Sequence, residues 1–265
     1  MRRLVLIAAL LVAAMPVLAE RPPYRFEINF GAFIPRLDTR IRLDGPGGLL
    51  GAELDFEESF NLANSTIVPI AQVDIWPSKK HGLSLIAFDL SRSSTGQSSI
   101  DFRFGDRIFA ANVPLDVAFD TKVAALTYSY KFFNNEHRSF GFNAGFNINQ
   151  IDARIAISDG PDSGTMESGE ATAPLPVFGV NGHVMLSKKW KFYGTIGVFA
   201  LSFDQYSGVL TSVSGGFIHH TFKNVGFGAG VYGFTVRVDS DNEGFMGRVE
   251  YGYNGVIAYL NLRFR

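Results

Sequence analysis

The chain has 265 residues and no cysteine, and its 24 basic and 25 acidic side chains leave a formal net charge of −1. The lack of cysteine excludes disulfides and thiolate metal sites, and the near-neutral charge gives no indication of a nucleic-acid partner. The 25 Phe and 28 Gly residues are typical of a membrane β-barrel, which needs apolar rings on its outer wall.

Residues 1–19 have the features of a cleavable export signal. Arg2 and Arg3 provide the positive start, residues 4–14 form an unbroken apolar run, and Pro16 ends it. The run is too short for a membrane helix, which needs about 20 apolar residues. Cleavage after Ala19 is expected to leave residues 20–265 as a single domain, exported to the bacterial outer membrane.

The mature part alternates with a period of two. At the first predicted strand, Phe26, Ile28 and Phe30 alternate with Glu27 and Asn29. Successive side chains of a β-strand point to opposite faces, so one face is apolar and the other polar. Similar segments predict ten strands: 24–35, 66–76, 82–92, 121–133, 139–151, 174–187, 191–203, 212–222, 225–236 and 245–264.

Two of these strands have an ambiguous pattern. In 82–92 two apolar sets of opposite parity compete, and in 212–222 either Phe217 or Ile218 could face lipid. The sequence is therefore also compatible with a barrel of eight or twelve strands. In the last strand Tyr251 and Tyr253 have the opposite parity to the apolar residues that follow, which predicts a β-bulge near Asn254.

Turn lengths predict which end of the barrel faces which side. Short polar breaks follow the second, fourth, sixth and eighth strands, and long segments rich in Gly, Ser, Asp and Glu follow the others. Bacterial barrels have short periplasmic turns and longer extracellular loops. The expected fold is therefore an all-β, antiparallel, up-and-down transmembrane barrel with both termini in the periplasm.

The charged residues divide between the short turns and the long segments. Seven of the eight lysines lie in or near the short turns, whereas the first and third long segments are acidic. Acidic outer loops suggest divalent cations at the lipopolysaccharide surface. The other expected partners are outer-membrane lipid and lipopolysaccharide themselves.

Several polar residues are predicted to face the lumen. The charged set is Glu27, Asp74, Lys131 and Arg263, and the uncharged set is Asn143, Asn147 and His183. Because the first and last strands close the barrel, Glu27 and Arg263 should be neighbours, and we expect them to form an ion pair. A paired network would plug the lumen, because buried charges are costly unless they are paired; a hydrated ring would instead form a narrow pore.

The pattern contains no catalytic or cofactor motif. His81 and His137 lie in predicted turns, and His219 and His220 point to opposite faces of a strand. His183 is four residues from Ser187, about 13 Å along a strand, so these two cannot act together. No catalytic residue, metal ligand or cofactor is therefore expected.

The chain resembles small Gram-negative outer-membrane β-barrel proteins. The resemblance rests on the signal, on Gly226, Gly228 and Gly230 alternating with apolar residues, and on a final strand that ends at Phe264 and Arg265. It implies insertion by the barrel assembly machinery, which recognises the last strand. Because the shared pattern is architectural, it implies no catalytic residue.

Three functional readings follow. The first is a non-enzymatic barrel with an envelope role or a narrow pore for small solutes. The second is a barrel enzyme that acts on envelope lipid or peptide. The third is a soluble periplasmic sandwich or lipid-binding barrel, whose strands would alternate in the same way with the apolar face inward.

Overall fold

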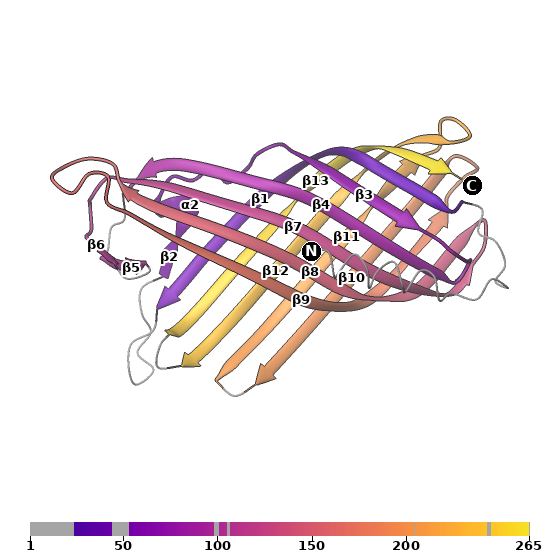
Figure 1. Cartoon of the computed structure of the whole chain (residues 1–265). Helices are drawn as coiled ribbons and strands as arrows, with labels where there is room; N and C mark the ends of the chain where they lie inside the picture. The colour runs from indigo at the N-terminus through magenta and orange to yellow at the C-terminus, as the bar shows by residue number, and fades with distance from the viewer. Residues whose placement is uncertain are drawn as a thin grey trace.

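A computed structural model describes residues 24–43, 53–97, 101–104, 107–203, 205–242 and 245–264. The export signal expected at 1–19 and the terminal Arg265 lie outside these residues. Ten long strands wrap into a barrel whose axis runs roughly from left to right in Figure 1. They are β1 (Phe26–Leu43), β3 (Val68–Ile75), β4 (His81–Gly96), β7 (Leu115–Asn134), β8 (Arg138–Ile157), β9 (Met166–Met185), β10 (Trp190–Phe203), β11 (Tyr206–His219), β12 (Val225–Asn242) and β13 (Phe245–Phe264).

The barrel is closed by its first and last strands. Each long strand pairs antiparallel with its sequence neighbour, and β13 also pairs with β1 from Phe26↔Phe264 to Leu43↔Gly247. Closure gives every long strand two hydrogen-bonded neighbours, as a strand in hydrocarbon requires. The prediction of ten strands is therefore confirmed, and the alternatives of eight or twelve strands are excluded.

The two ends of the barrel differ. One end holds the start of β1, the end of β13 and the four short turns, and we call it the short-turn end; we call the other the loop end (Figure 1). The short turns lie where the sequence predicted them, but the strands reach further toward the loop end: β7 begins at Leu115 rather than at 121. As a result, two connections expected to be long are short, with Phe203 paired to Tyr206 and Asn242 to Phe245.

The predicted bulge near Asn254 is wrong. The register of β13 with β1 and with β12 runs past Asn254 without a shift. Tyr251 and Tyr253 are buried in the lumen, on the same face as Tyr259, while Glu250 points outward. The apolar residues change faces because the environments of the two faces change along the barrel. Near the short-turn end the outer face is apolar and the lumen is polar; near the loop end the outer face is polar and the lumen is packed with apolar side chains.

The half of the barrel nearest the short-turn end has the character of a membrane wall. Its outward side chains are apolar and exposed, as with Phe30 (60%), Phe146 (54%) and Phe227 (55%). A soluble sandwich would bury such residues, so this exterior excludes the third functional reading. The ambiguous strand β11 follows the same rule, with Phe217 outward and Ile218 buried.

Aromatic side chains fill the lumen in the other half. Phe88 of β4 packs edge-on against Tyr253 of β13 (5.3 Å between ring centroids) and Tyr232 of β12 (6.1 Å). Phe119 of β7 contacts Tyr251 of β13 at 6.3 Å. Because β4 and β7 are not sheet neighbours of β12 or β13, these contacts cross the lumen. We call these rings the aromatic core: the buried Phe33, Phe56, Phe60, Phe88, Phe119, Phe234, Tyr251 and Tyr253, with the partly buried Tyr232 packed against them.

A short insert from the first loop completes this core. It comprises β2 (Glu53–Asp55) and α2 (Phe56–Ser59), whose N-cap Asp55 accepts a hydrogen bond from the Glu58 backbone amide. Phe56 and Phe60 point into the lumen and pack on each other at 5.2 Å. Gly96 permits this approach, because a Cβ there would lie 2.6 Å from the Phe60 backbone. No helix among the described residues is long and apolar enough to cross a membrane.

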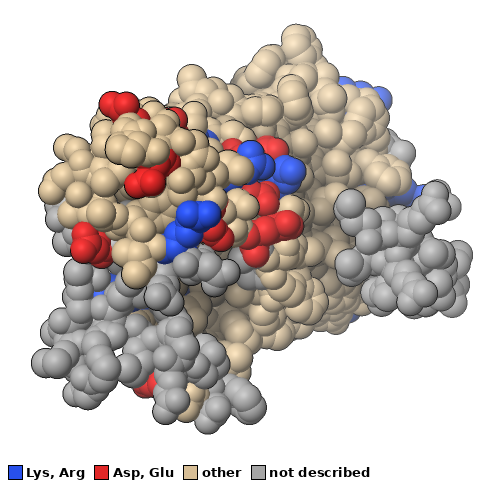
Figure 2. Space-filling view, turned by 60° about the vertical axis from the view of Figure 1, so that its left-hand side comes forward, with Lys and Arg blue, Asp and Glu red and all other residues tan. Residues whose placement is uncertain are grey.

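Charged side chains cover the exterior near the loop end. Figure 2 shows basic and acidic residues side by side there, with a broad uncharged zone of wall beside them. Arg237 pairs with Glu250 at 2.8 Å and Arg248 with Asp239 at 2.6 Å, both on the outer face of β12 and β13. The second loop adds a small hairpin, β5 (Phe102–Phe104) and β6 (Arg107–Phe109).

Candidate functional site

The lumen contains a large cavity of about 850 Å³ between the aromatic core and the short-turn end. Tyr232 and Ile257 line it on the side of the core, and Lys188, Lys189 and Lys223 of the short turns line it on the other side. We call this cavity the vestibule. All four charged residues predicted to face the lumen line it, as do Asn143, Asn147 and His183.

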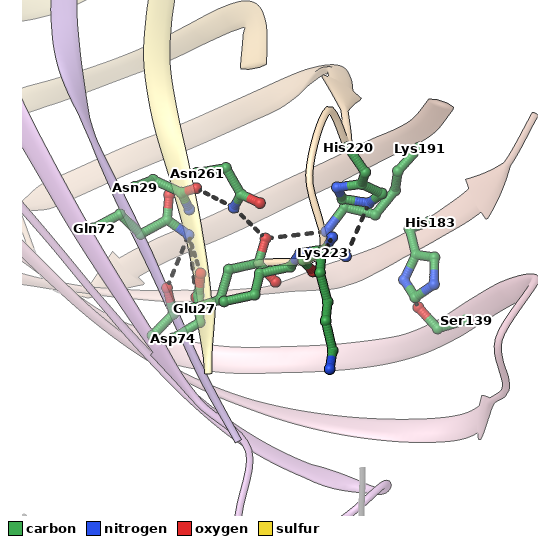
Figure 3. Close-up of polar contacts among 12 residues, drawn as sticks. Glu27, Asn29, Gln72, Asp74, Ser139, His183, Lys191, His220, Lys223 and Asn261 are labelled. Atoms are coloured by element: carbon green, nitrogen blue, oxygen red, sulfur yellow. Dashed lines mark hydrogen bonds and ion pairs between the residues drawn. The ribbon is translucent and has the colours of Figure 1, made fainter. Parts of the chain in front are cut away.

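Glu27 is the centre of one hydrogen-bond network (Figure 3). Its carboxylate accepts from Lys191 Nζ at 3.1 Å and from Asn261 Nδ2 at 2.7 Å. Asn261 also donates to Asn29 at 2.7 Å. The expected pairing with Arg263 is wrong: the two residues are register partners, as predicted, but Glu27 binds Lys191 from the opposite wall.

Arg263 is instead held by the short-turn end. Its guanidinium donates to His220 Nε2 and to the Lys223 carbonyl oxygen, each at 3.3 Å, and lies 4.4 Å from the centre of the Tyr24 ring.

Asp74 is hydrogen-bonded on the wall beside Glu27. Gln72 Nε2 donates to both Asp74 oxygens, at 3.1 and 3.0 Å, and also reaches Ser84 at 3.3 Å. These three residues lie on β3 and β4, next to Glu27 on β1 (Figure 3). Glu27 and Asp74 therefore share one side of the vestibule.

Lys131 lies on another side, on β7. Its ammonium donates to the Asn181 side chain, which in turn donates to Ser129 at 2.9 Å. The ammonium also lies 5.7 Å from the centre of the Trp76 ring, within cation–π range. Lys131 is only 5% exposed, and among the described residues no carboxylate forms an ion pair with it.

His183 has a partner that sequence spacing did not reveal. Its Nδ1 is 2.6 Å from the hydroxyl of Ser139, the register partner of His183 across β8 and β9. The sequence analysis considered only Ser187, in the turn after β9, and excluded it by distance. Finding Ser139 would have required the register of these two strands, which the alternation pattern alone does not fix.

Asn143 and Asn147 lie on β8, and both are 3% exposed. Asn147 accepts a hydrogen bond from Asn149 at 3.1 Å. Both residues line the vestibule as predicted, but neither contacts the charged groups through a hydrogen bond among the described residues.

A group of three carboxylates lies at the loop end. Oxygens of Asp38, Asp55 and Glu57 come within 4.8 Å of one another. Arg40 contacts Asp38 at 3.0 Å and Asp55 at 3.5 Å, and Arg92 contacts Glu57 at 2.5 Å. Arginines therefore already neutralise these acids. Binding of a divalent cation at the acidic loops remains a prediction.

No protein-family model matches the chain, and no curated protein matches its sequence. Among solved structures, the chain is similar to the outer membrane protease OmpT from Escherichia coli, with 11% identity, 90% of this chain and 97% of that chain covered, and a TM-score of 0.60. The P. putida toluene transporter TodX gives 7% identity, coverages of 92% and 91%, and a TM-score of 0.34. Ail of Yersinia pestis gives 10% identity, coverages of 89% and 99%, and a TM-score of 0.33.

The likeness to OmpT establishes the barrel fold and carries no activity, because identity is low. The closed barrel and its exposed apolar wall are independent evidence for a membrane environment. Together they show that the chain has the fold of outer-membrane β-barrel proteins, with a wall suited to a membrane.

Proposed function

We propose that this protein is a non-enzymatic structural component of the outer membrane and that its lumen forms no continuous pore. The observation that carries the proposal is the aromatic core, which spans the lumen from β4 and β7 to β12 and β13. Small barrels are commonly filled by side chains. A solute that entered the vestibule would meet this apolar layer before it reached the loop end.

The same proposal assigns the environment of each surface. The apolar wall lies in the bilayer, and the short-turn end lies in the periplasm. The charged exterior at the loop end lies among lipopolysaccharide head groups, where exposed arginines such as Arg237 and Arg248 can exchange their carboxylate partners for phosphate. Insertion by the barrel assembly machinery accords with the apolar last strand.

A deletion strain tests this role against that of a pore. We expect it to admit detergent and hydrophobic dyes faster than the parent strain, and to take up small hydrophilic solutes at the parental rate. Expression of the wild-type gene should restore the barrier. Slower uptake of a small hydrophilic solute by the deletion strain would contradict the proposal and indicate a pore.

The Ser139–His183 hydrogen bond favours a second candidate function, hydrolysis of an envelope ester or peptide. A serine nucleophile needs a base within hydrogen-bond distance, and His183 Nδ1 at 2.6 Å meets that requirement. Among the described residues no carboxylate is hydrogen-bonded to His183, so an orienting acid is missing. This is why we favour the structural role.

A fluorophosphonate probe separates the two functions. A hydrolase would be labelled at Ser139, and the Ser139→Ala variant would not be labelled. We expect no labelling of the folded wild-type protein. Labelling that depends on both Ser139 and His183 would promote the second candidate.

A further inference from the structure

We propose that the vestibule is a binding site for a small soluble polyanion, of the carboxylate or phosphate class, that enters from the periplasm. The cationic residues of this site lie outside the aromatic core that closes the lumen, so the inference goes beyond the structural role. It rests on the charge balance of the cavity, on buried cations without acidic partners, and on the size and opening of the cavity.

The vestibule is strongly positive although the whole chain is not. Six cationic residues line it: Lys131, Lys188, Lys189, Lys191, Lys223 and Arg263. Three acidic residues line it: Glu27, Asp74 and Glu136. The difference is three positive charges, in a chain whose net charge is −1. A cavity with one dominant sign of charge concentrates ions of the opposite sign.

Two of the buried cations have no acidic partner. Among the described residues, neither Lys131 (5% exposed) nor Arg263 (7% exposed) has a carboxylate within ion-pair distance. Lys191 has one, Glu27, and also interacts electrostatically with Lys131. Buried charges are costly when they are unpaired. An anion beside Lys131 and Lys191 would supply the missing countercharge.

The charges come from different strands, which gives the anion a definite place. Glu27 and Asp74 lie on the neighbouring strands β1 and β3 (Figure 3), whereas Lys131 lies on β7 and Lys191 on β10. The Lys191 ammonium extends across the lumen to Glu27 at 3.1 Å and also interacts electrostatically with Lys131, so the anion would bind on the Lys131 side of Lys191 and compete with Glu27 for it. The polar side chains of Asn181 and Thr195 line the same side and offer hydrogen bonds.

The cavity fits a small molecule. Its volume of about 850 Å³ lies within the usual range for ligand pockets. Lys188, Lys189 and Lys223 lie in the short turns at its mouth, so an approaching ligand would meet positive charge first. Residues of three of the four short turns line the cavity, which places its mouth among these turns and favours a water-soluble anion over a lipid head group.

Tryptophan fluorescence provides a direct test, because Trp76 lines the vestibule beside Lys131. The chain has only two tryptophans, so a Trp190→Phe background leaves Trp76 as the single reporter. The full mature protein, folded in a zwitterionic detergent, is titrated with citrate and separately with pyrophosphate at constant ionic strength. We expect a saturable change with at least one of them and none with chloride.

Matched variants locate the site. Lys131→Gln and Lys191→Gln should each weaken binding by about tenfold or more, while Lys131→Arg should keep it. Lys80→Gln is the control, because Lys80 is an exposed lysine of the same end that does not line the vestibule. Heat-modifiable gel mobility confirms that each variant is folded. As a second readout, the anion should protect the Lys131→Arg variant against thermal unfolding.

Three results would overturn the proposal. The first is no saturable change in the folded wild-type protein. The second is an equal loss for Lys80→Gln and Lys131→Gln, which would indicate general attraction by the basic end. The third is a response to phosphatidylglycerol vesicles but to neither soluble anion, which would assign the positive end to lipid contact.

Discussion

Glu27 and Lys191, which lie 164 positions apart, form an ion pair of 3.1 Å across the lumen. Their strands, β1 and β10, are not neighbours in the sheet, so the pair joins opposite walls of the barrel. Asn261 holds the same Glu27 oxygen at 2.7 Å. The contact therefore links three strands at the depth where the lumen is still polar.

Loss of the Glu27 charge should destabilise the barrel. In Glu27→Gln, Lys191 loses its countercharge but keeps access to water in the vestibule, so we expect a loss of about 1–3 kcal/mol in the free energy of unfolding. Reversible urea titration measures it, and Lys191→Met closes a double-mutant cycle. Asp239→Asn, which breaks an exposed pair with Arg248, should cost less than about 1 kcal/mol. Equal losses for the two substitutions would contradict the role of the lumen pair.

The two faces of β8 should tolerate charge differently. Phe146 is 54% exposed on the apolar wall, so Phe146→Arg should cost about 2–4 kcal/mol near the bilayer midplane. Asn143 lines the vestibule, where an added arginine can reach water, so Asn143→Arg should be milder. The folded fraction in lipid vesicles, measured by gel mobility, compares them. More damage from Asn143→Arg would mean that the vestibule is dry.

The barrel should lose stability in acid through His220, in the turn after β11. Burial, and then the nearby Arg263 and Lys191 charges, lower the pKa of His220 from 6.5 to about 4. Between these pH values the unfolded chain binds a proton at His220 and the folded protein does not. The stability that the folded state has above pH 6.5 is therefore progressively lost as the pH falls toward 4. His220→Gln should reduce the drop in urea midpoint between pH 7 and pH 5. An unchanged drop would exclude this histidine as its cause.

Surface tags test the orientation of the barrel. Epitopes inserted at Ala110 and Gly164, in loops of the loop end, should be labelled in intact cells. Epitopes at Asn135 and Lys189, in short turns, should be labelled only after the outer membrane is permeabilised. Labelling of the Asn135 tag on intact cells would reverse the assignment, and with it the direction from which the vestibule opens.

The sequence predicted the barrel well where lipid and a polar lumen face each strand. The alternation of β1 and β13 placed Glu27 and Arg263 inside the barrel, and the structure shows them as register partners. The prediction failed toward the loop end, where Tyr253 faces the lumen and Glu250 the outside. Alternation reports which face is apolar, and it cannot tell lipid from a packed interior.

The contacts of the site were harder to predict than its residues. The alternation placed Glu27, Asp74, Lys131 and His183 in the lumen, but their partners depend on which walls meet across it. Lys191 reaches Glu27 because of the curvature of a ten-stranded barrel, and Ser139 meets His183 because of the β8–β9 register. Neither relationship is encoded in the spacing of residues along one strand.

Conductance in a planar lipid bilayer tests the closed lumen most directly. Insertion of the purified wild-type barrel should give no steady current steps, because the aromatic core fills the lumen. A variant that carries Phe88→Ala and Tyr253→Ala removes the rings that meet across the lumen at 5.3 Å, and its currents would show that the protein inserts. Steady current steps from the wild-type protein, with an ion selectivity altered by Glu27→Gln, would contradict the closed lumen.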